Sequence, residues 1–134
     1  MKTIRLGLMS LAHGHGHSYA KAAKALPGVR LAGIFDEDAA RGSAAAQTYG
    51  CDFYADAGAL LAAVDGVMIC SDNRRHYPYA KEAAEAGVPI LVEKPITTVP
   101  EEGRELIDLC AAKGIALQTA FPVRLNASFL KAKA

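Results

Sequence analysis

Two opposite charges, Glu93 and Lys94, directly follow a short apolar run of the chain, and Pro95 comes next. Charged side chains are rarely placed against a buried strand unless they are paired or bind a ligand. A lysine in this position can donate a proton or a hydrogen bond to a carbinol or carbonyl oxygen, and Glu93 can orient the lysine or a bound cofactor. A surface turn is the alternative interpretation of the same residues.

The segment after the first apolar run is rich in small residues and histidines. A dinucleotide-binding turn needs the spacing G-x-G-x-x-G, whose glycines allow a tight turn and a close approach to pyrophosphate. No register of this segment fits that pattern. The physical requirement can still be met, because Ser10 and Ala12 are small and a following helix N-terminus can hold phosphate. Gly14 and Gly16 add flexibility.

Three histidines of this segment, His13, His15 and His17, raise the question of a metal site. Zinc favours imidazole ligands, and three of them can form an open catalytic site. Residues two apart diverge on a strand or a helix, so all three converge only if the loop curls. We therefore favour a polar loop in which the imidazoles of His13 and His15 donate hydrogen bonds to phosphate or water, and we predict no metal.

An aspartate, Asp36, ends the second apolar run. In NAD sites a carboxylate at this place accepts hydrogen bonds from the adenosine ribose hydroxyls. A helix N-cap is the alternative role, but Asp38 is the better cap candidate, which leaves Asp36 free. A free carboxylate repels a 2′-phosphate and so favours NAD over NADP. Arg41, one short helical turn later, could reverse that preference.

Small and polar residues also follow the fourth apolar run, with the sequence Cys70-Ser71-Asp72-Asn73-Arg74-Arg75-His76. Such groups at the carboxyl end of a strand are placed to line a cofactor crevice. The same residues can form a turn and a helix cap, with Asp72 or Asn73 as the cap. The two roles are compatible.

Short apolar runs alternate with helical stretches along the whole chain. The runs are rich in Val, Ile and Leu and almost continuously apolar, as expected for strands that helices bury on both faces. They cover residues 4–9, 29–35, 51–54, 67–70, 89–92 and 115–120, and the helical stretches cover residues 18–26, 38–49, 57–63, 74–86 and 100–113. This alternation predicts an α/β fold with a doubly wound, mostly parallel sheet of Rossmann type, about six strands and three layers. The strand ends then share one edge, which brings Asp36 and Lys94 to opposite ends of one groove.

The composition excludes several classes of protein. The chain has 134 residues, of which 51% are hydrophobic and 22% charged, which supports one globular domain. Its formal charge of +1 without a basic stripe argues against nucleic acid or a membrane surface as a partner. No apolar run is long enough to span a bilayer and no signal-peptide pattern stands at the start, so we expect a cytoplasmic protein. Three dispersed cysteines fit reduced, buried thiols.

Taken together, these segments resemble the Gfo/Idh/MocA family of NAD(P)-dependent oxidoreductases over about residues 4–124. The motifs that carry the resemblance are Arg5-Leu6-Gly7-Leu8-Met9, Asp36 with Arg41, Ile69-Cys70-Ser71-Asp72-Asn73 with His76, Glu93-Lys94-Pro95, and Pro122-Val123-Arg124. The resemblance implies a domain that binds NAD, with NADP as the alternative, and makes Lys94 the active-site lysine and Asp36 the ribose ligand. It places Ser71, Asn73, His76 and Glu93 at the cofactor crevice. The implied substrates are sugars, inositols and other small polyols.

Two departures from the family pattern stand out, the His-rich loop in place of the glycine fingerprint and Asp72 where proline is frequent. Members of the family also continue into a second α/β domain that supplies the substrate pocket. We therefore expect residues 1–122 to form the nucleotide-binding domain and residues 123–134 a tail at the start of the second domain. The alternative function is a non-catalytic nucleotide-binding or assembly module. Apolar surface left uncovered by a second domain is compatible with a homo-oligomer.

Overall fold

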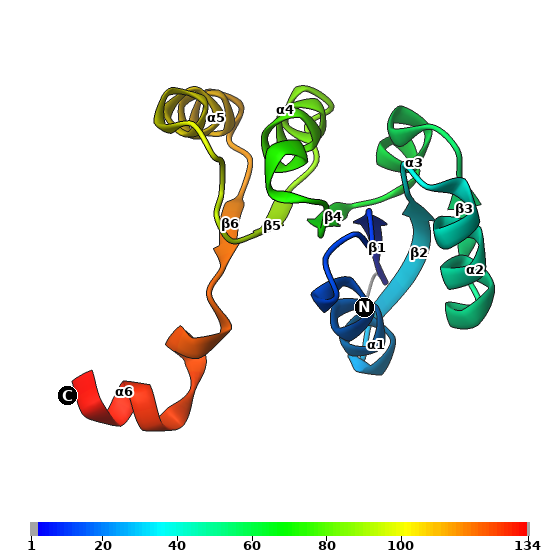
Figure 1. The fold of residues 1–134 in the computed structure, drawn as a ribbon, viewed down its shortest axis with the longest axis horizontal. Coiled ribbons are helices and arrows are strands. Elements are labelled where there is room, and N and C mark those ends of the chain that lie inside the picture. Colours follow the sequence, from blue (N-terminus) through cyan, green and yellow to red (C-terminus); the bar gives the residue numbers. More distant parts are fainter. Residues whose placement is uncertain (1–2, 134) are drawn as a thin grey trace.

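The structure is a computed structural model that describes residues 3–133, so the outermost ends of the predicted domain and tail lie outside the described residues (Figure 1). The strands are β1 (Ile4–Met9), β2 (Val29–Phe35), β3 (Asp52–Tyr54), β4 (Gly66–Ile69), β5 (Ile90–Glu93) and β6 (Leu117–Ala120). The helices are α1 (His15–Ala25), α2 (Ala39–Tyr49), α3 (Ala57–Ala63), α4 (His76–Glu85), α5 (Pro100–Lys113) and α6 (Ala127–Lys133), with short 3-10 helices at Asn73–Arg75 and Pro122–Leu125.

All of these strands are parallel, and their order in the sheet is β3-β2-β1-β4-β5-β6. The chain builds outward from β1 in one direction, then returns to add β4 on the other side of β1 and builds outward again. Ligands of such sheets bind where the strand order reverses, at the carboxyl ends of the strands. The doubly wound, parallel Rossmann-type fold predicted from the sequence is confirmed, and its switch point lies between β1 and β4.

Helices cover both faces of the sheet and create two apolar cores (Figure 1). On one face α3, α4 and α5 pack around Leu60, Ile69 and Leu106. On the other face α1 and α2 pack around Leu8 and Ile34. Both cores are rich in alanine, which lets the helix backbones approach the sheet closely. Among residues 3–133, no helix is long and apolar enough to cross a membrane.

Two boundaries near the switch point differ from the sequence prediction. Helix α1 begins at His15 rather than at residue 18, so His15 and His17 belong to the helix instead of the loop. Because glycine has a low helix propensity, the predicted start of the helix was too late. In the structure, packing of Gly16 against Cys70 outweighs this low propensity. Strand β5 extends to Glu93, which pairs with Ala120 of β6, so Lys94 is the first residue beyond the strand.

The tail after β6 is helical and extends away from the sheet (Figure 1). A 3-10 helix at Pro122–Leu125 leads into α6, and every described residue of the tail is exposed. Its large apolar side chains are among the most exposed of the molecule: Val123, Leu125, Phe129 and Leu130. The tail therefore presents an apolar surface that the described residues leave uncovered.

Candidate functional site

The predicted ends of the groove, Asp36 and Lys94, lie along the same edge of the sheet. Asp36 follows β2 and Lys94 follows β5, and strands β1 and β4 lie between them. With strands about 4.8 Å apart, the two tips are separated by roughly 14 Å. The residues between them come from the β1–α1 turn and from the segment after β4, as the topology requires.

The β1–α1 turn achieves the tight geometry of a dinucleotide-binding turn without its first glycine. Ser10 has φ +67°, a left-handed conformation that favours glycine. Its hydroxyl accepts a hydrogen bond from the Ala12 N–H and donates one to Glu37 Oε1, both at 3.1 Å. The backbone N–H of His13 donates to the Cys70 carbonyl at 2.9 Å, which ties the turn to the tip of β4. Side-chain and backbone hydrogen bonds thus hold a turn that glycine usually permits.

Gly16 provides the close contact between helix and strand. A Cβ atom at this position would lie 3.3 Å from Cys70 Cβ and 3.4 Å from both Leu11 Cγ and the Ser10 carbonyl oxygen. The first turn of α1 therefore stands directly against the switch point, and the N-terminus of a helix attracts a pyrophosphate. The spacing from Ser10 to Gly16 is one residue longer than the fingerprint, which explains why no register of the motif fits the sequence.

The carboxylate of Asp36 is occupied by protein groups. It accepts hydrogen bonds from the backbone N–H groups of Leu11 and Asp38, at 2.8 and 2.9 Å. Arg41 donates to both of its oxygens, from Nε at 2.9 Å and from Nη2 at 2.6 Å. Asp38 caps α2 as predicted, by accepting the Arg41 N–H at 3.0 Å. The prediction that this leaves Asp36 free is wrong, because Arg41 and the β1–α1 turn enclose its side chain.

Glu93 is a carboxylate at the tip of β5 that is only 1% exposed. Its Oε1 accepts the Tyr19 hydroxyl and contacts His15 Nδ1, each at 2.7 Å, and its Oε2 accepts the Lys94 backbone N–H at 3.1 Å. Burial opposes ionisation, but these hydrogen bonds outweigh it and hold the pKa of Glu93 below its usual value. Burial, and then the bond to Glu93, raises the pKa of the Tyr19 hydroxyl. Glu93 is therefore a fixed negative charge at the tip of β5.

His76, which the family resemblance places at the cofactor crevice, is fully buried. Its Nδ1 donates to the Pro95 carbonyl at 2.6 Å, and its Nε2 lies 3.3 Å from the Ser71 carbonyl oxygen. The imidazole thus links the segments that follow β4 and β5. With no exposed surface, it positions these two segments and does not offer its ring to a cofactor.

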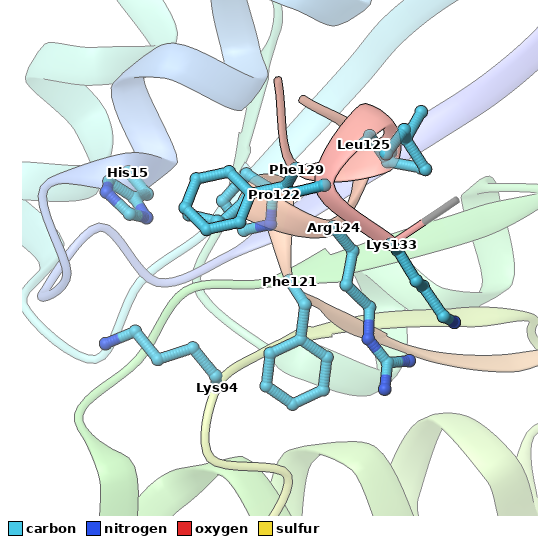
Figure 2. A pocket seen from close by; sticks show the side chains of 11 residues that line it. His15, Lys94, Phe121, Pro122, Arg124, Leu125, Phe129 and Lys133 are labelled. Carbon is cyan, nitrogen blue, oxygen red and sulfur yellow. The ribbon is translucent and has the colours of Figure 1, made fainter. Parts of the chain in front are cut away.

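Lys94 extends into a hollow of about 980 Å³ between the sheet edge and the tail. Figure 2 shows Lys94 and His15 on one side of this hollow and Phe121, Pro122 and Phe129 of the tail on the other. The lysine is exposed, and its peptide bond to Pro95 is cis. An ammonium group with an apolar wall opposite can meet a small polar molecule held between the two.

The other predicted site residues divide into accessible and enclosed groups. Ala12, His13, Arg41 and Asn73 keep exposed or partly exposed surface along the edge. Ser10 and Ser71 are fully buried, and the Ser71 hydroxyl donates to the Asp72 carbonyl at 3.0 Å. Asp72 is the cap of the segment after β4, accepting the Arg74 N–H at 3.1 Å.

Sequence reasoning missed Tyr19 and Arg75. Tyr19 lies four residues after His15 on α1, so both side chains reach Glu93 from the same face of the helix. Arg75 pairs with Asp72 and approaches Glu37 to 3.8 Å, which adds a second guanidinium near Arg41. The i, i+4 spacing of His15 and Tyr19 could have indicated that the two side chains share one face of a helix. The sequence prediction did not use it, because it began the helix only at residue 18.

Comparisons with known proteins agree with this geometry. Residues 6–121 match the model of the Gfo/Idh/MocA oxidoreductase family, described as an NAD-binding Rossmann fold. UDP-N-acetylglucosamine 3-dehydrogenase of Acidithiobacillus ferrooxidans is 35% identical over 117 residues, which are 87% of this chain and 36% of that protein. Inositol 2-dehydrogenase of Rhizobium meliloti is 31% identical over 129 residues, 96% of this chain and 39% of that protein.

A solved structure of the Acidithiobacillus enzyme superposes on this chain with a TM-score of 0.92 at 32% identity. The match covers 99% of this chain and 43% of the solved chain. The chain therefore spans about two fifths of the length of such relatives. The matched region, strand order and sheet-edge geometry lead to one conclusion: the chain belongs to the Gfo/Idh/MocA oxidoreductase family and contains its NAD-binding Rossmann fold.

Proposed function

We propose that this chain is the nucleotide-binding part of an NAD(P)-dependent dehydrogenase that acts on a sugar, an inositol or a related small polyol. One observation carries the proposal, the exposed ammonium group of Lys94 at the tip of β5, beside the switch point of an all-parallel sheet. The names of the relatives, a UDP-sugar dehydrogenase and an inositol dehydrogenase, support the substrate class.

The residues along the edge fit a dinucleotide. The β1–α1 turn is tight and Gly16 keeps α1 close to β4, which leaves room for a pyrophosphate at the helix N-terminus. Asp36 lies where the adenosine ribose is held in such folds, although Arg41 must release it first. A bound nicotinamide cofactor supplies the hydride acceptor or donor.

The chemistry of this chain is then proton transfer at Lys94. During oxidation of a carbinol, the Lys94 side chain would accept the hydroxyl proton as the hydride passes from carbon to a bound nicotinamide cofactor. During reduction, the ammonium group returns a proton to the carbonyl oxygen. The Glu93 carboxylate accepts the Lys94 backbone N–H and so fixes the point from which the lysine side chain extends. His76 fixes the next carbonyl, that of Pro95.

NAD is the proposed cofactor, with NADP as the alternative. Around the β2 tip, Asp36, Glu37 and Asp72 outnumber the guanidinium groups of Arg41 and Arg75. This excess of negative charge disfavours a 2′-phosphate. NADP would require both arginines to leave their carboxylates and turn toward the phosphate.

Titration with NADH and NADPH, followed by nicotinamide fluorescence, tests the nucleotide-binding part of the proposal. We expect saturable binding of NADH, tighter than that of NADPH. Absence of saturable binding of either at millimolar cofactor overturns the proposal.

Turnover on a panel of sugars and polyols, measured in the protein that carries this chain, tests the role of Lys94. We expect Lys94→Ala to lower kcat by at least about 100-fold. NADH affinity should stay within about threefold, since the lysine does not hold the nucleotide. Lys21→Ala, an exposed lysine on α1, is the matched control and should keep full activity.

A non-catalytic nucleotide-binding or assembly module is the second candidate, favoured by the exposed apolar side chains of the tail. If turnover is reconstituted with a partner chain, full turnover with the Lys94→Ala variant of this chain would favour this candidate over the dehydrogenase. A homo-oligomer formed through the tail would appear in light scattering and disappear on Phe129→Ser.

Free thiols at Cys51, Cys70 and Cys110 support a reducing compartment such as the cytoplasm.

A further inference from the structure

The side chains of His13, His15 and Glu93 form a cluster of possible metal ligands. The proposed function does not explain why these three ligand types meet. One ligand atom from each lies within 4.8 Å of the others. His13 lies in the β1–α1 turn, His15 begins α1 and Glu93 ends β5, so the cluster bridges the switch point. Two imidazoles and one carboxylate are the donor set of open zinc sites. We propose that this cluster binds a divalent transition-metal ion of the Zn²⁺ type.

Glu93 is the member of the cluster that most needs a cation. Its side chain is fully buried, and among the ion pairs of residues 3–133 its partner is His15, which is charged only when protonated. A buried carboxylate is stable when it is paired with a cation or coordinates a metal. Hydrogen bonds from Tyr19 and from the Lys94 N–H hold the carboxylate in place, as the outer partners of metal ligands do.

The two histidines can turn lone pairs toward the ion with small movements. His15 Nδ1 and Glu93 Oε1 are 2.7 Å apart, at hydrogen-bond distance, and a metal ion would replace this contact. Ligands of a tetrahedral zinc ion lie roughly 3.4 Å from one another, so this pair widens by less than about 1 Å. His13 Nδ1 accepts the His15 N–H at 3.2 Å, and its ring stands edge-on to that of His15 with centroids 4.6 Å apart.

The cluster differs from the histidine triplet that the sequence suggested. His17 Nδ1 lies 2.7 Å from the Tyr49 hydroxyl, on the side of α1 that faces α2. Glu93, distant in the sequence, takes its place. His17 belongs to the same run of histidines but lies outside the cluster, so His17→Ala is a matched control for metal binding.

The free coordination positions of such an ion would face the hollow that Lys94 enters. His15 and Lys94 line this hollow together (Figure 2). Three protein ligands leave at least one position open, and water or the oxygen of a small polar molecule can fill it. The inference depends on the cluster alone, and not on the proposed dehydrogenase function.

Metal content and metal affinity of protein purified without a histidine tag test the inference. After equilibration with Zn²⁺ and gel filtration, elemental analysis should find about one equivalent. Substitution by Co²⁺ should give the visible absorption of a four-coordinate ion. His15→Ala should weaken Zn²⁺ binding by at least about tenfold, whereas His17→Ala should leave it unchanged. Glu93→Gln tests the third ligand, and circular dichroism spectra check that both this variant and His15→Ala remain folded.

Three outcomes would overturn the metal site. The first is a Zn²⁺ content below roughly 0.1 equivalent. The second is an equal loss of affinity in His15→Ala and His17→Ala, which would indicate a loose chelate of the loop. The third is unchanged affinity in a folded Glu93→Gln variant. NADH titration of the same samples keeps the two proposals apart, because NADH binding without Zn²⁺ binding rejects the metal site alone.

Discussion

Arg41 covers Asp36 with a two-pronged ion pair, from Nε at 2.9 Å to one carboxylate oxygen and from Nη2 at 2.6 Å to the other. The carboxylate that was expected to meet the ribose is instead buried beneath a guanidinium group that is about one-third exposed. Cofactor choice at the β2 tip therefore depends on whether this pair opens.

Arg41→Gln should shift the preference further toward NADH. Without the guanidinium, Asp36 and Glu37 face a 2′-phosphate unscreened, so the Kd for NADPH should rise by at least about tenfold. The Kd for NADH should stay within about threefold, because Asp36 becomes available to the ribose hydroxyls. Fluorescence titration of both cofactors checks this. Arg30→Gln, at the opposite end of β2, should change neither value, and an equal loss for both cofactors in Arg41→Gln would contradict the argument.

His76→Ala should destabilise the domain by about 2–4 kcal/mol, because it removes a buried ring and leaves the Pro95 carbonyl without its donor. Urea unfolding followed by circular dichroism measures the loss. His17→Ala, whose ring is exposed, should cost less than about 1 kcal/mol. The NADH Kd should also rise in His76→Ala, since the segments after β4 and β5 lose their link. A stability close to that of the wild type would mean that the imidazole is not a structural bridge.

Gly16→Ala should cost about 1–3 kcal/mol, because the new methyl group meets Cys70 and Leu11 at 3.3–3.4 Å and pushes α1 from β4. Gly14→Ala is the comparison, since nothing lies within 4 Å of its added Cβ, and its cost should stay below about 1 kcal/mol. Thermal unfolding of both variants separates them. Equal effects would show that the turn, and not the helix–strand contact, is sensitive to substitution.

Glu82→Gln should stabilise the protein at neutral pH. Burial, and then the nearby charges of Asp56 and Glu85, raise the pKa of Glu82 above its value in the unfolded chain. The ionised form of Glu82 therefore lowers the free energy of unfolding. This loss is absent at acidic pH, where the carboxyl is protonated in both the folded and the unfolded chain. The loss grows as pH rises through the pKa of Glu82. The variant should gain roughly 1–3 °C in Tm at pH 7 and nothing near pH 4.

Melting curves across this pH range provide the measurement. Glu101→Gln is the control, because Glu101 is exposed in the first turn of α5, where a negative charge is favourable. It should show no gain at neutral pH. A gain of Glu82→Gln that is equal at both pH values would point to packing rather than to the charge.

The sequence alone determined the fold and the edge of the sheet on which the site lies. Apolar runs such as residues 4–9 and 89–92, separated by stretches with helix stop signals, allow few arrangements besides a parallel sheet with right-handed crossovers. Once the strands are parallel, the residues that follow them must share one edge. The sequence therefore placed Asp36 and Lys94 along one edge of the sheet.

Only the tertiary structure decided what each side chain at that edge contacts. The bonds of Glu93 to His15 and Tyr19 span 78 and 74 residues of sequence, and no local pattern encodes them. The bond of His76 to Pro95 and the enclosure of Asp36 by Leu11 and Arg41 are likewise products of packing. Strand and helix patterns fix which residues come near one another. Burial and side-chain geometry, which depend on the whole folded chain, then fix which atoms pair.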